Sequence, residues 1–176
     1  MGLNKAIFFD RDGVLNKSVV KDGCPFPPSS LSELILTDSI EETCHCLRSL
    51  GYILIIITNQ PDVARGKTSV EAVGEINEFL KKKLNLDSIY CCFHDDHDRC
   101  DCRKPLPGML VQAQKKYDLD FESSYVIGDR WKDIQAGFIV GCKTIFIDYD
   151  YAEKKIPSDF VIYSTKEIIN IFGDLK

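Results

Sequence analysis

Short runs of consecutive apolar residues alternate along this chain with longer segments whose apolar residues recur at helical spacing. The run at residues 53–57, Ile-Leu-Ile-Ile-Ile, suits a strand buried on both faces of a parallel sheet. The pattern predicts further strands at 6–9, 89–93, 125–127, 143–147 and 160–163, and helices at 40–50, 68–84, 107–117, 131–140 and 165–172. Strands that alternate with helices indicate an α/β fold with helices on both faces of the sheet.

The size and charge of the chain limit what it can bind. Its 176 residues suffice for one domain with a substantial core, and we expect a single domain over residues 1–176. The formal net charge of −5 argues against general binding to nucleic acid or to an anionic membrane. No apolar run approaches the roughly 20 residues of a membrane-spanning helix, and the N-terminus lacks a signal-peptide pattern. We therefore expect a cytoplasmic monomer with no membrane or nucleic-acid partner.

Two aspartates stand directly after the first predicted strand. Asp10 and Asp12 are separated by Arg11, which we assign to substrate binding, and Gly13 lets the backbone turn away. In open α/β sheets, chemistry gathers outside the carboxyl ends of the strands. There, Asp10 can hold Mg²⁺ through one oxygen and attack phosphorus with the other, and Asp12 can protonate the leaving oxygen. Taken alone, the pair fits an Asp-rich turn equally well.

Polar residues also follow the run at 53–57. Thr58, Asn59 and Gln60 carry a hydroxyl and two amides that can hydrogen-bond phosphate oxygens without adding charge. Such residues are common in turns, so this motif is weak when taken alone. We assign Thr58 to catalysis and the two amides to substrate binding.

The strand at 125–127 is the third to end in residues suited to chemistry. Asp129 is placed to complete an oxygen-ligand set for Mg²⁺ with Asp10. Asp133, one helical turn further on, either orders the water around the metal or caps the helix. Arg130 either reaches a phosphate or sugar hydroxyl or lies on the surface, and we assign it to substrate binding.

Four metal-binding side chains lie close together in the chain. Cys92 and His94 are separated from Cys100 and Cys102 by five residues. This spacing lets one loop, residues 92–102, surround a tetrahedral Zn²⁺, and four protein ligands would make the zinc structural. Cys91 and His97 are rival ligands, although Cys91 should point to the opposite side of its strand from Cys92.

A basic pair follows the cysteines directly. A loop held by zinc would fix Arg103 and Lys104 rigidly. Lys104, as a point charge, suits the reacting phosphoryl group, and the planar fork of Arg103 suits a second anionic or hydroxyl group. Residues 17–36 have no clear periodicity and are too short for a separate cap domain. They form either one wall of the substrate site or a surface connection.

Together these residues resemble the motifs of the haloacid dehalogenase superfamily of phosphotransferases, over nearly the whole chain. The motifs are Asp10-Arg11-Asp12-Gly13, Thr58, Lys104 and Gly128-Asp129-Arg130-x-x-Asp133. A narrower group is similar in Thr58-Asn59-Gln60, Ala64-Arg65-Gly66-Lys67 and Cys102-Arg103-Lys104-Pro105. That group comprises the D-glycero-D-manno-heptose-1,7-bisphosphate 7-phosphatases and the related histidinol-phosphate phosphatases.

The resemblance implies a Rossmann-like, doubly wound parallel sheet whose first five strands are ordered 3-2-1-4-5, without a large cap domain. It also implies an aspartyl-phosphate intermediate on Asp10 and acid/base work by Asp12. Mg²⁺ would be held by the carboxylates of Asp10 and Asp129 and by the main-chain carbonyl of Asp12. The expected function is a Mg²⁺-dependent phosphatase of carbohydrate metabolism that acts on a small phosphate monoester, with a sugar bisphosphate as substrate.

Four features depart from the heptose enzymes, and all line the expected substrate side. The zinc loop is short, Phe93 stands where those enzymes have Pro, and Val14-Leu15 and Pro61-Asp62 replace the usual Thr-Ile and Ser-Gly pairs. A histidinol-phosphate phosphatase therefore stays open. So do a phospho-accepting signalling module and a zinc-stabilised binding protein without turnover. Asp12 favours the enzyme, because a signalling module has little use for an acid/base group two residues beyond its phospho-acceptor.

Overall fold

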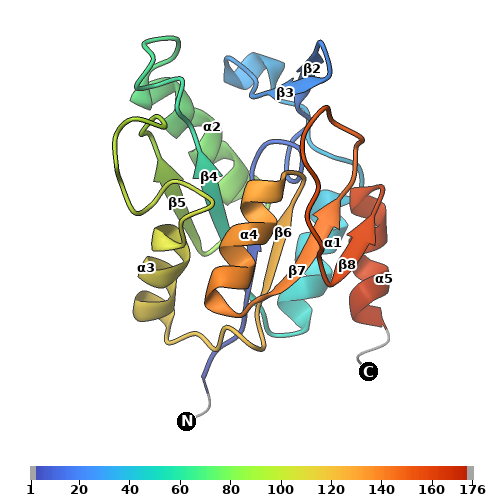
Figure 1. Ribbon diagram of the computed structural model, residues 1–176. Helices are drawn as coiled ribbons and strands as arrows, with labels where there is room; N and C mark the ends of the chain where they lie inside the picture. Colours follow the sequence, from blue (N-terminus) through green and yellow to red (C-terminus); the bar gives the residue numbers. More distant parts are fainter. Residues whose placement is uncertain (1–2, 174–176) are drawn as a thin grey trace.

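The computed structural model describes residues 3–173, and its centre is a sheet of six parallel strands (Figure 1). The strands lie in the order β5-β4-β1-β6-β7-β8. Their bounds are β1 Ala6–Phe9, β4 Ile53–Asn59, β5 Ser88–Cys92, β6 Tyr125–Gly128, β7 Lys143–Ile147 and β8 Phe160–Ile162. The predicted order 3-2-1-4-5 is thus confirmed, with β8 added at the edge beside β7. β1, β4 and β6 are neighbours, so their carboxyl ends meet.

Helices cover both faces of the sheet, as the strand composition requires. On one face lie α1 (Ile40–Ser49), α2 (Val70–Lys83) and α5 (Ile168–Gly173), and on the other lie α3 (Gly108–Tyr117) and α4 (Trp131–Val140). β1 serves both layers because successive side chains point to opposite faces. Ile7 and Phe9 belong to the first apolar cluster, whereas Ala6 and Phe8 belong to the second, and all four are fully buried. Within residues 3–173, no helix is long and apolar enough to cross a bilayer.

Residues 17–36 form a small hairpin above the carboxyl ends of the strands (Figure 1). Its strands are β2 (Val19–Lys21) and β3 (Cys24–Phe26), which pair antiparallel, and a one-turn 3₁₀ helix follows at Leu31–Glu33. The amide of Ala152 donates to the carbonyl of Gly23 at 3.3 Å, which joins the hairpin to the loop after β7. Cys24 and the segment Pro25–Pro27 line the cavity at the carboxyl ends of β1 and β4. For residues 17–36 the sequence left two interpretations open, a wall of the substrate site or a surface connection. The structure favours the first, because the hairpin forms a wall of this cavity.

The start of α1 differs from what its sequence suggests. Ser39 and Glu42 have the spacing of a capping box, yet Ser39 adopts φ 59° and its side chain caps nothing. A hydrogen bond between distant parts of the chain fixes the start of α1 instead. The hydroxyl of Thr37, which precedes the helix, donates to the carbonyl of Val14 at 2.5 Å. A second short 3₁₀ helix, Thr165–Glu167, leads into α5.

Candidate active site

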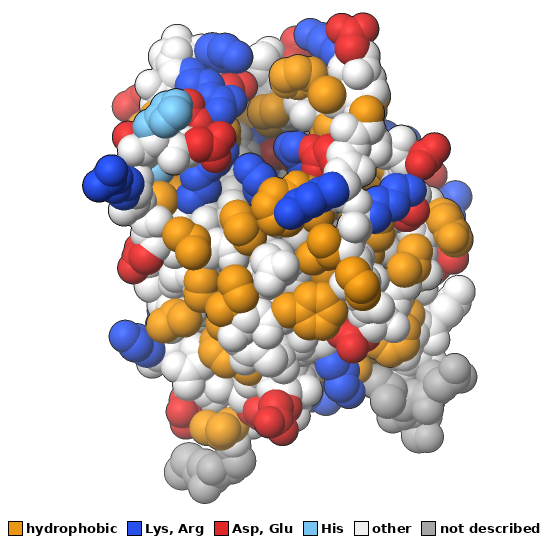
Figure 2. Space-filling model, viewed as in Figure 1, with side chains coloured by type: hydrophobic (Ala, Val, Ile, Leu, Met, Phe, Trp, Pro, Cys, Tyr) orange, Lys and Arg blue, Asp and Glu red, His pale blue; other side chains and the backbone are white. Residues whose placement is uncertain are grey.

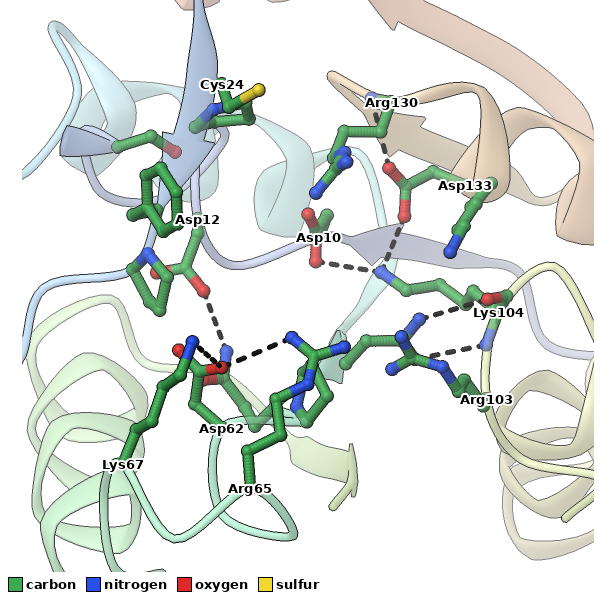
Figure 3. Close-up of a pocket in the computed structure, with 18 residues that line it drawn as sticks. Asp10, Asp12, Cys24, Asp62, Arg65, Lys67, Arg103, Lys104, Arg130 and Asp133 are labelled. Carbon is green, nitrogen blue, oxygen red and sulfur yellow. Dashed lines mark hydrogen bonds and ion pairs between the residues drawn. The ribbon is translucent and has the colours of Figure 1, made fainter. Parts of the chain in front are cut away.

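A buried cluster of charges lies where β1, β4 and β6 end (Figure 3). Lys104 Nζ lies 2.8 Å from Asp10 Oδ1 and 2.5 Å from Asp133 Oδ1, and it donates to the carbonyl of Ile57 at 2.7 Å. Burial raises the pKa of Asp10 to about 7, although Lys104 opposes this rise. Burial lowers the pKa of Lys104, but the carboxylates of Asp10 and Asp133 outweigh this and hold it above its usual value. The lysine therefore stays charged beside Asp10.

Asp129 differs from the other charged groups of this cluster because its carboxylate is buried without a hydrogen-bond partner in the described part of the chain. It is 2 % exposed, and neither carboxylate oxygen has a hydrogen-bond partner within residues 3–173. Burial and the nearby carboxylates of Asp10 and Asp133 raise its pKa well above the ordinary value. Gly13, at φ +92°, makes room for it, because a Cβ at that position would collide with the Asp129 carboxylate.

These donors fit Mg²⁺. A buried carboxylate without partners needs a counter-charge, and oxygen is the ligand atom that Mg²⁺ prefers. One oxygen each of Asp10, Asp129 and Asp133 lie within 4.8 Å of one another. Asp133 is already engaged, since its Oδ2 accepts from the Arg130 amide at 3.2 Å while Oδ1 meets Lys104. It thus caps α4 and holds Lys104, which leaves Asp10 and Asp129 for the metal.

Asp12 is held from three sides. Its carboxylate accepts from Gln60 Nε2 at 2.7 Å, from Asn16 Nδ2 at 3.0 Å and from the guanidinium of Arg11 at 3.0–3.2 Å. Arg11 is completely buried and also donates to Asn77. It does not line the cavity, contrary to the substrate-binding role expected from sequence. The arginine lies behind Asp12, where it orients the carboxylate.

The polar residues at the carboxyl end of β4 and directly after it support the site. Thr58 is buried, and its hydroxyl accepts from Gln60 Nε2 at 2.9 Å. Asn59 makes two 3.0 Å hydrogen bonds with the main chain of Lys104. Asn59 and Gln60 both line the cavity, and their amides also fix Lys104 and Asp12 in place.

Above these groups is a cavity of about 260 Å³ with a strongly cationic border. Figure 2 shows lysine and arginine side chains around the hollow on this face. Besides Lys104, five such side chains line it: Arg65, Lys67, Arg103, Arg130 and Lys132. The sequence led us to expect substrate binding by Arg103 and Arg130. It did not lead us to expect a role for Arg65, Lys67 or Lys132. The run Ala64–Lys67 held a usable signal, whereas Lys132 resembles any exposed residue in the first turn of a helix.

The predicted metal loop brings its four candidate ligands together. Cys92 Sγ lies 3.5 Å from His94 Nδ1, 3.8 Å from Cys100 Sγ and 3.1 Å from Cys102 Sγ. The separations of 3.5 and 3.8 Å match the edges of a tetrahedron around an ion with bonds of about 2.0–2.3 Å, whereas the 3.1 Å between Cys92 and Cys102 is shorter than such an edge between two sulfurs. Neither rival ligand, Cys91 or His97, belongs to the cluster found within residues 3–173.

Comparison with known proteins finds relatives that match over nearly the whole chain. The family model described as HAD-hydrolase-like matches residues 101–166. A relative from Campylobacter jejuni, D-glycero-alpha-D-manno-heptose-1,7-bisphosphate 7-phosphatase, is 35% identical over 97% of this chain and 96% of its own. The beta-anomer enzyme from Yersinia pestis is 34% identical over 93% and 92%. The solved D,D-heptose 1.7-bisphosphate phosphatase of B. bronchiseptica, complexed with magnesium and phosphate, has a TM-score of 0.83 at 26% identity, covering 98% and 99%.

A parallel sheet with Asp10, Asp12 and Asp129 directly beyond its strands, and with Lys104 beside Asp10, is typical of a phosphate-transferring hydrolase of the haloacid dehalogenase class. With relatives that match over nearly the full length of both chains, the protein belongs to the haloacid dehalogenase-like hydrolase family and is a phosphoric monoester hydrolase.

Proposed function

We propose that this protein hydrolyses the 7-phosphate of D-glycero-D-manno-heptose 1,7-bisphosphate in a Mg²⁺-dependent reaction. The observation that carries the proposal is the match to the Campylobacter jejuni enzyme over 97% of the chain. The cavity supports it, because it combines a buried acidic centre with a cationic border suited to a doubly phosphorylated sugar. We also propose that residues 1–176 act as one catalytic domain and as a cytoplasmic monomer.

Mg²⁺ would be held by the carboxylates of Asp10 and Asp129 and by the main-chain carbonyl of Asp12. When bound, it supplies positive charge that neutralises phosphoryl oxygens. The partnerless oxygens of Asp129 support this assignment.

In the proposed reaction, a carboxylate oxygen of Asp10 attacks phosphorus while the bond from phosphorus to the sugar oxygen breaks. Asp12 donates a proton to that leaving oxygen and then takes one from the water that hydrolyses the aspartyl-phosphate. Gln60, Asn16 and Arg11 support this role because they fix the direction of the Asp12 carboxylate. Lys104 would oppose the negative charge of the phosphoryl group, and the Thr58 hydroxyl, which accepts from Gln60, would serve as a neutral donor to it.

We propose that Zn²⁺ occupies Cys92, His94, Cys100 and Cys102 as a structural ion. Four protein ligands leave no open position for substrate or water. Arg103 directly follows the last ligand, and its guanidinium donates to the main-chain carbonyl of His94 at 3.2 Å. A metal at this cluster would therefore fix the segment that carries Arg103 and Lys104.

The test is phosphate release from a panel of esters, with and without Mg²⁺. The panel contains both anomers of heptose 1,7-bisphosphate, fructose 1,6-bisphosphate, histidinol phosphate and a nucleotide. We expect the fastest Mg²⁺-dependent release from one heptose anomer and none from the Asp10→Asn variant. Asp118→Asn is the matched control, since Asp118 is exposed at the end of α3. Faster release from histidinol phosphate would overturn the substrate, and an active Asp10→Asn variant would overturn the nucleophile.

A further inference from the structure

A tyrosine from the loop between β7 and β8 reaches the turn that follows β1. This loop rises toward the hairpin (Figure 1), and in it the hydroxyl of Tyr149 donates to the main-chain carbonyl of Gly13 at 3.0 Å. β6 lies between β1 and β7 in the sheet, so the bond passes across the end of β6, where Asp129 follows. Tyr149 does not line the cavity above Asp10 and Asp12. It can therefore act on the reaction only through the groups that it holds.

The turn at Gly13 sets the spacing of the proposed Mg²⁺ ligands. Gly13 shares a peptide group with the carbonyl of Asp12, and its amide donates to the carbonyl of Asn16 at 2.7 Å. On its other side Gly13 lies directly against the carboxylate of Asp129. Even a small displacement of Gly13 thus moves the Asp12 carbonyl relative to Asp129. Because Mg²⁺ demands near-ideal octahedral geometry, such a displacement weakens its binding.

The turn has room to move unless a distant segment holds it. Asp12 lines the cavity above the site, whereas Gly13 and Tyr149 line a second cavity of about 400 Å³. Gly13 has φ +92°, and a glycine between two cavities has neither a side chain nor dense packing to fix its position. Without the Tyr149 hydroxyl, water from the second cavity would satisfy the Gly13 carbonyl, and water does not fix its position.

The backbone on either side of Tyr149 is itself held. Lys155 Nζ lies 2.8 Å from Asp148 Oδ2 and 3.0 Å from Asp150 Oδ1. The amide of Asp150 also donates to Asp148 Oδ1 at 2.9 Å. Burial, and after it the nearby carboxylate of Asp129, raise the pKa of Tyr149 to about 12. The hydroxyl therefore keeps the proton that it donates, and the loop presents it in a fixed direction.

We propose that Tyr149 is a positioning residue of the Mg²⁺ site, because its hydroxyl holds the Gly13 turn against Asp129. The inference rests on the proposed function, since it requires Mg²⁺ at Asp10, Asp129 and the main-chain carbonyl of Asp12. Partners of this kind, which orient a metal ligand without touching the metal, change metal affinity when they are removed. The expected defect of Tyr149→Phe is therefore weaker metal binding that an excess of metal overcomes.

The first measurement is metal binding without substrate. Mn²⁺ is the probe, because carboxylate and carbonyl oxygens suit both ions and free Mn²⁺ can be followed by electron paramagnetic resonance. The protein is saturated with Zn²⁺ beforehand and the excess is removed. We expect Tyr149→Phe, which loses only the hydroxyl, to raise the Kd for Mn²⁺ about three- to tenfold. Tyr163→Phe is the matched control, since Tyr163 is 69% exposed, and Asp129→Asn should abolish binding at the site.

The second measurement is turnover of the best ester of the panel as Mg²⁺ is varied. Tyr149→Phe should need about three- to tenfold more Mg²⁺ for its half-maximal rate. At saturating Mg²⁺ its kcat, and its KM for the ester, should stay within about twofold of the wild type. A tyrosine that merely stabilised the fold would lower kcat at every Mg²⁺ concentration.

The outcomes separate this inference from the proposed function. If Tyr149→Phe binds Mn²⁺ as tightly as the wild type, or if excess Mg²⁺ does not restore its kcat, the positioning role is refuted and the proposed function stands. If the metal defect is found in a protein that prefers another ester, the heptose assignment falls and the positioning role stands. Mn²⁺ binding that Asp129→Asn leaves unchanged would refute both the metal site and the inference.

Discussion

Replacing Lys104 by Met tests whether the buried charges at the site are held together by this lysine. Lys104 is 2 % exposed, and its Nζ contacts Asp10, Asp133 and the carbonyl of Ile57 within 2.8 Å. Met has a similar length and packs well, so the change removes the charge and the donors with little loss of volume. Two buried carboxylates then lose their counter-charge and one carbonyl loses its donor.

The expected cost follows from these contacts. Removing one partner of a buried ion pair destabilises a protein by roughly 3–5 kcal/mol, because the remaining charge stays buried. In a chain of this size each kcal/mol lowers the melting temperature by about 2–4 °C, so Lys104→Met should melt about 6–20 °C lower. In the double variant Lys104→Met/Asp133→Asn one stranded carboxylate is neutral, and it should recover part of the loss.

The assay is urea and thermal unfolding of the metal-chelated protein, followed by circular dichroism, with Lys82→Met, on an exposed position of α2, as the matched control. Chelation matters because a divalent cation would replace part of the missing positive charge. The reasoning is refuted if Lys104→Met costs less than about 1 kcal/mol, or if the double variant is less stable than the single one.

Three shorter predictions concern the rest of the site. Gly13→Ala should abolish Mg²⁺-dependent turnover and cost roughly 1–3 kcal/mol in unfolding assays, because its Cβ collides with Asp129. Gly51→Ala has a similar φ of +83° without a collision, so it should keep full activity, and equal loss in both would contradict the argument. Metal analysis should find about one zinc per chain, and its verified removal should lower the melting temperature; an unchanged melting curve would speak against a structural ion. Arg11→Gln should lower kcat far more than it raises KM, since Arg11 orients Asp12, whereas a change confined to KM would indicate contact with substrate.

The sequence predicts the fold well because the sheet is buried on both faces. A strand such as 53–57 must be apolar throughout, so its position is visible without a structure, although the strand itself continues through Thr58 to Asn59. The catalytic edge follows from the same pattern, because parallel strands place all their carboxyl ends together. Asp10 and Asp129 are 119 positions apart in the sequence. We could still predict that they lie close together, because each follows a predicted strand of the same parallel sheet.

Side-chain direction at that edge is much harder to predict. Arg11 stands between two site aspartates, but its guanidinium turns inward to Asn77, a residue of α2 that no motif identifies. Asn59 faces the cavity, yet its amide bonds the main chain of Lys104, 45 residues further along. Both outcomes depend on contacts between distant segments, whereas local patterns report only burial and secondary structure. The same limit applies to the hairpin at 17–36, whose three-residue strands are too short for a period to appear.

The zinc loop illustrates how a recognisable motif carries information that its pattern does not reveal. The spacing of cysteines and histidine indicates a metal, but the residues between the ligands have no motif. The structure gives two of these residues a function in the site. The carboxylate of Asp95 accepts two hydrogen bonds from Arg65, at 2.6 and 2.7 Å, and these bonds hold the pKa of Asp95 well below its usual range. Asp96 holds Arg103 in the same way. The loop therefore positions cations from two segments of the cavity border, so removing a metal from Cys92, His94, Cys100 and Cys102 should disturb substrate binding more than the chemistry at Asp10.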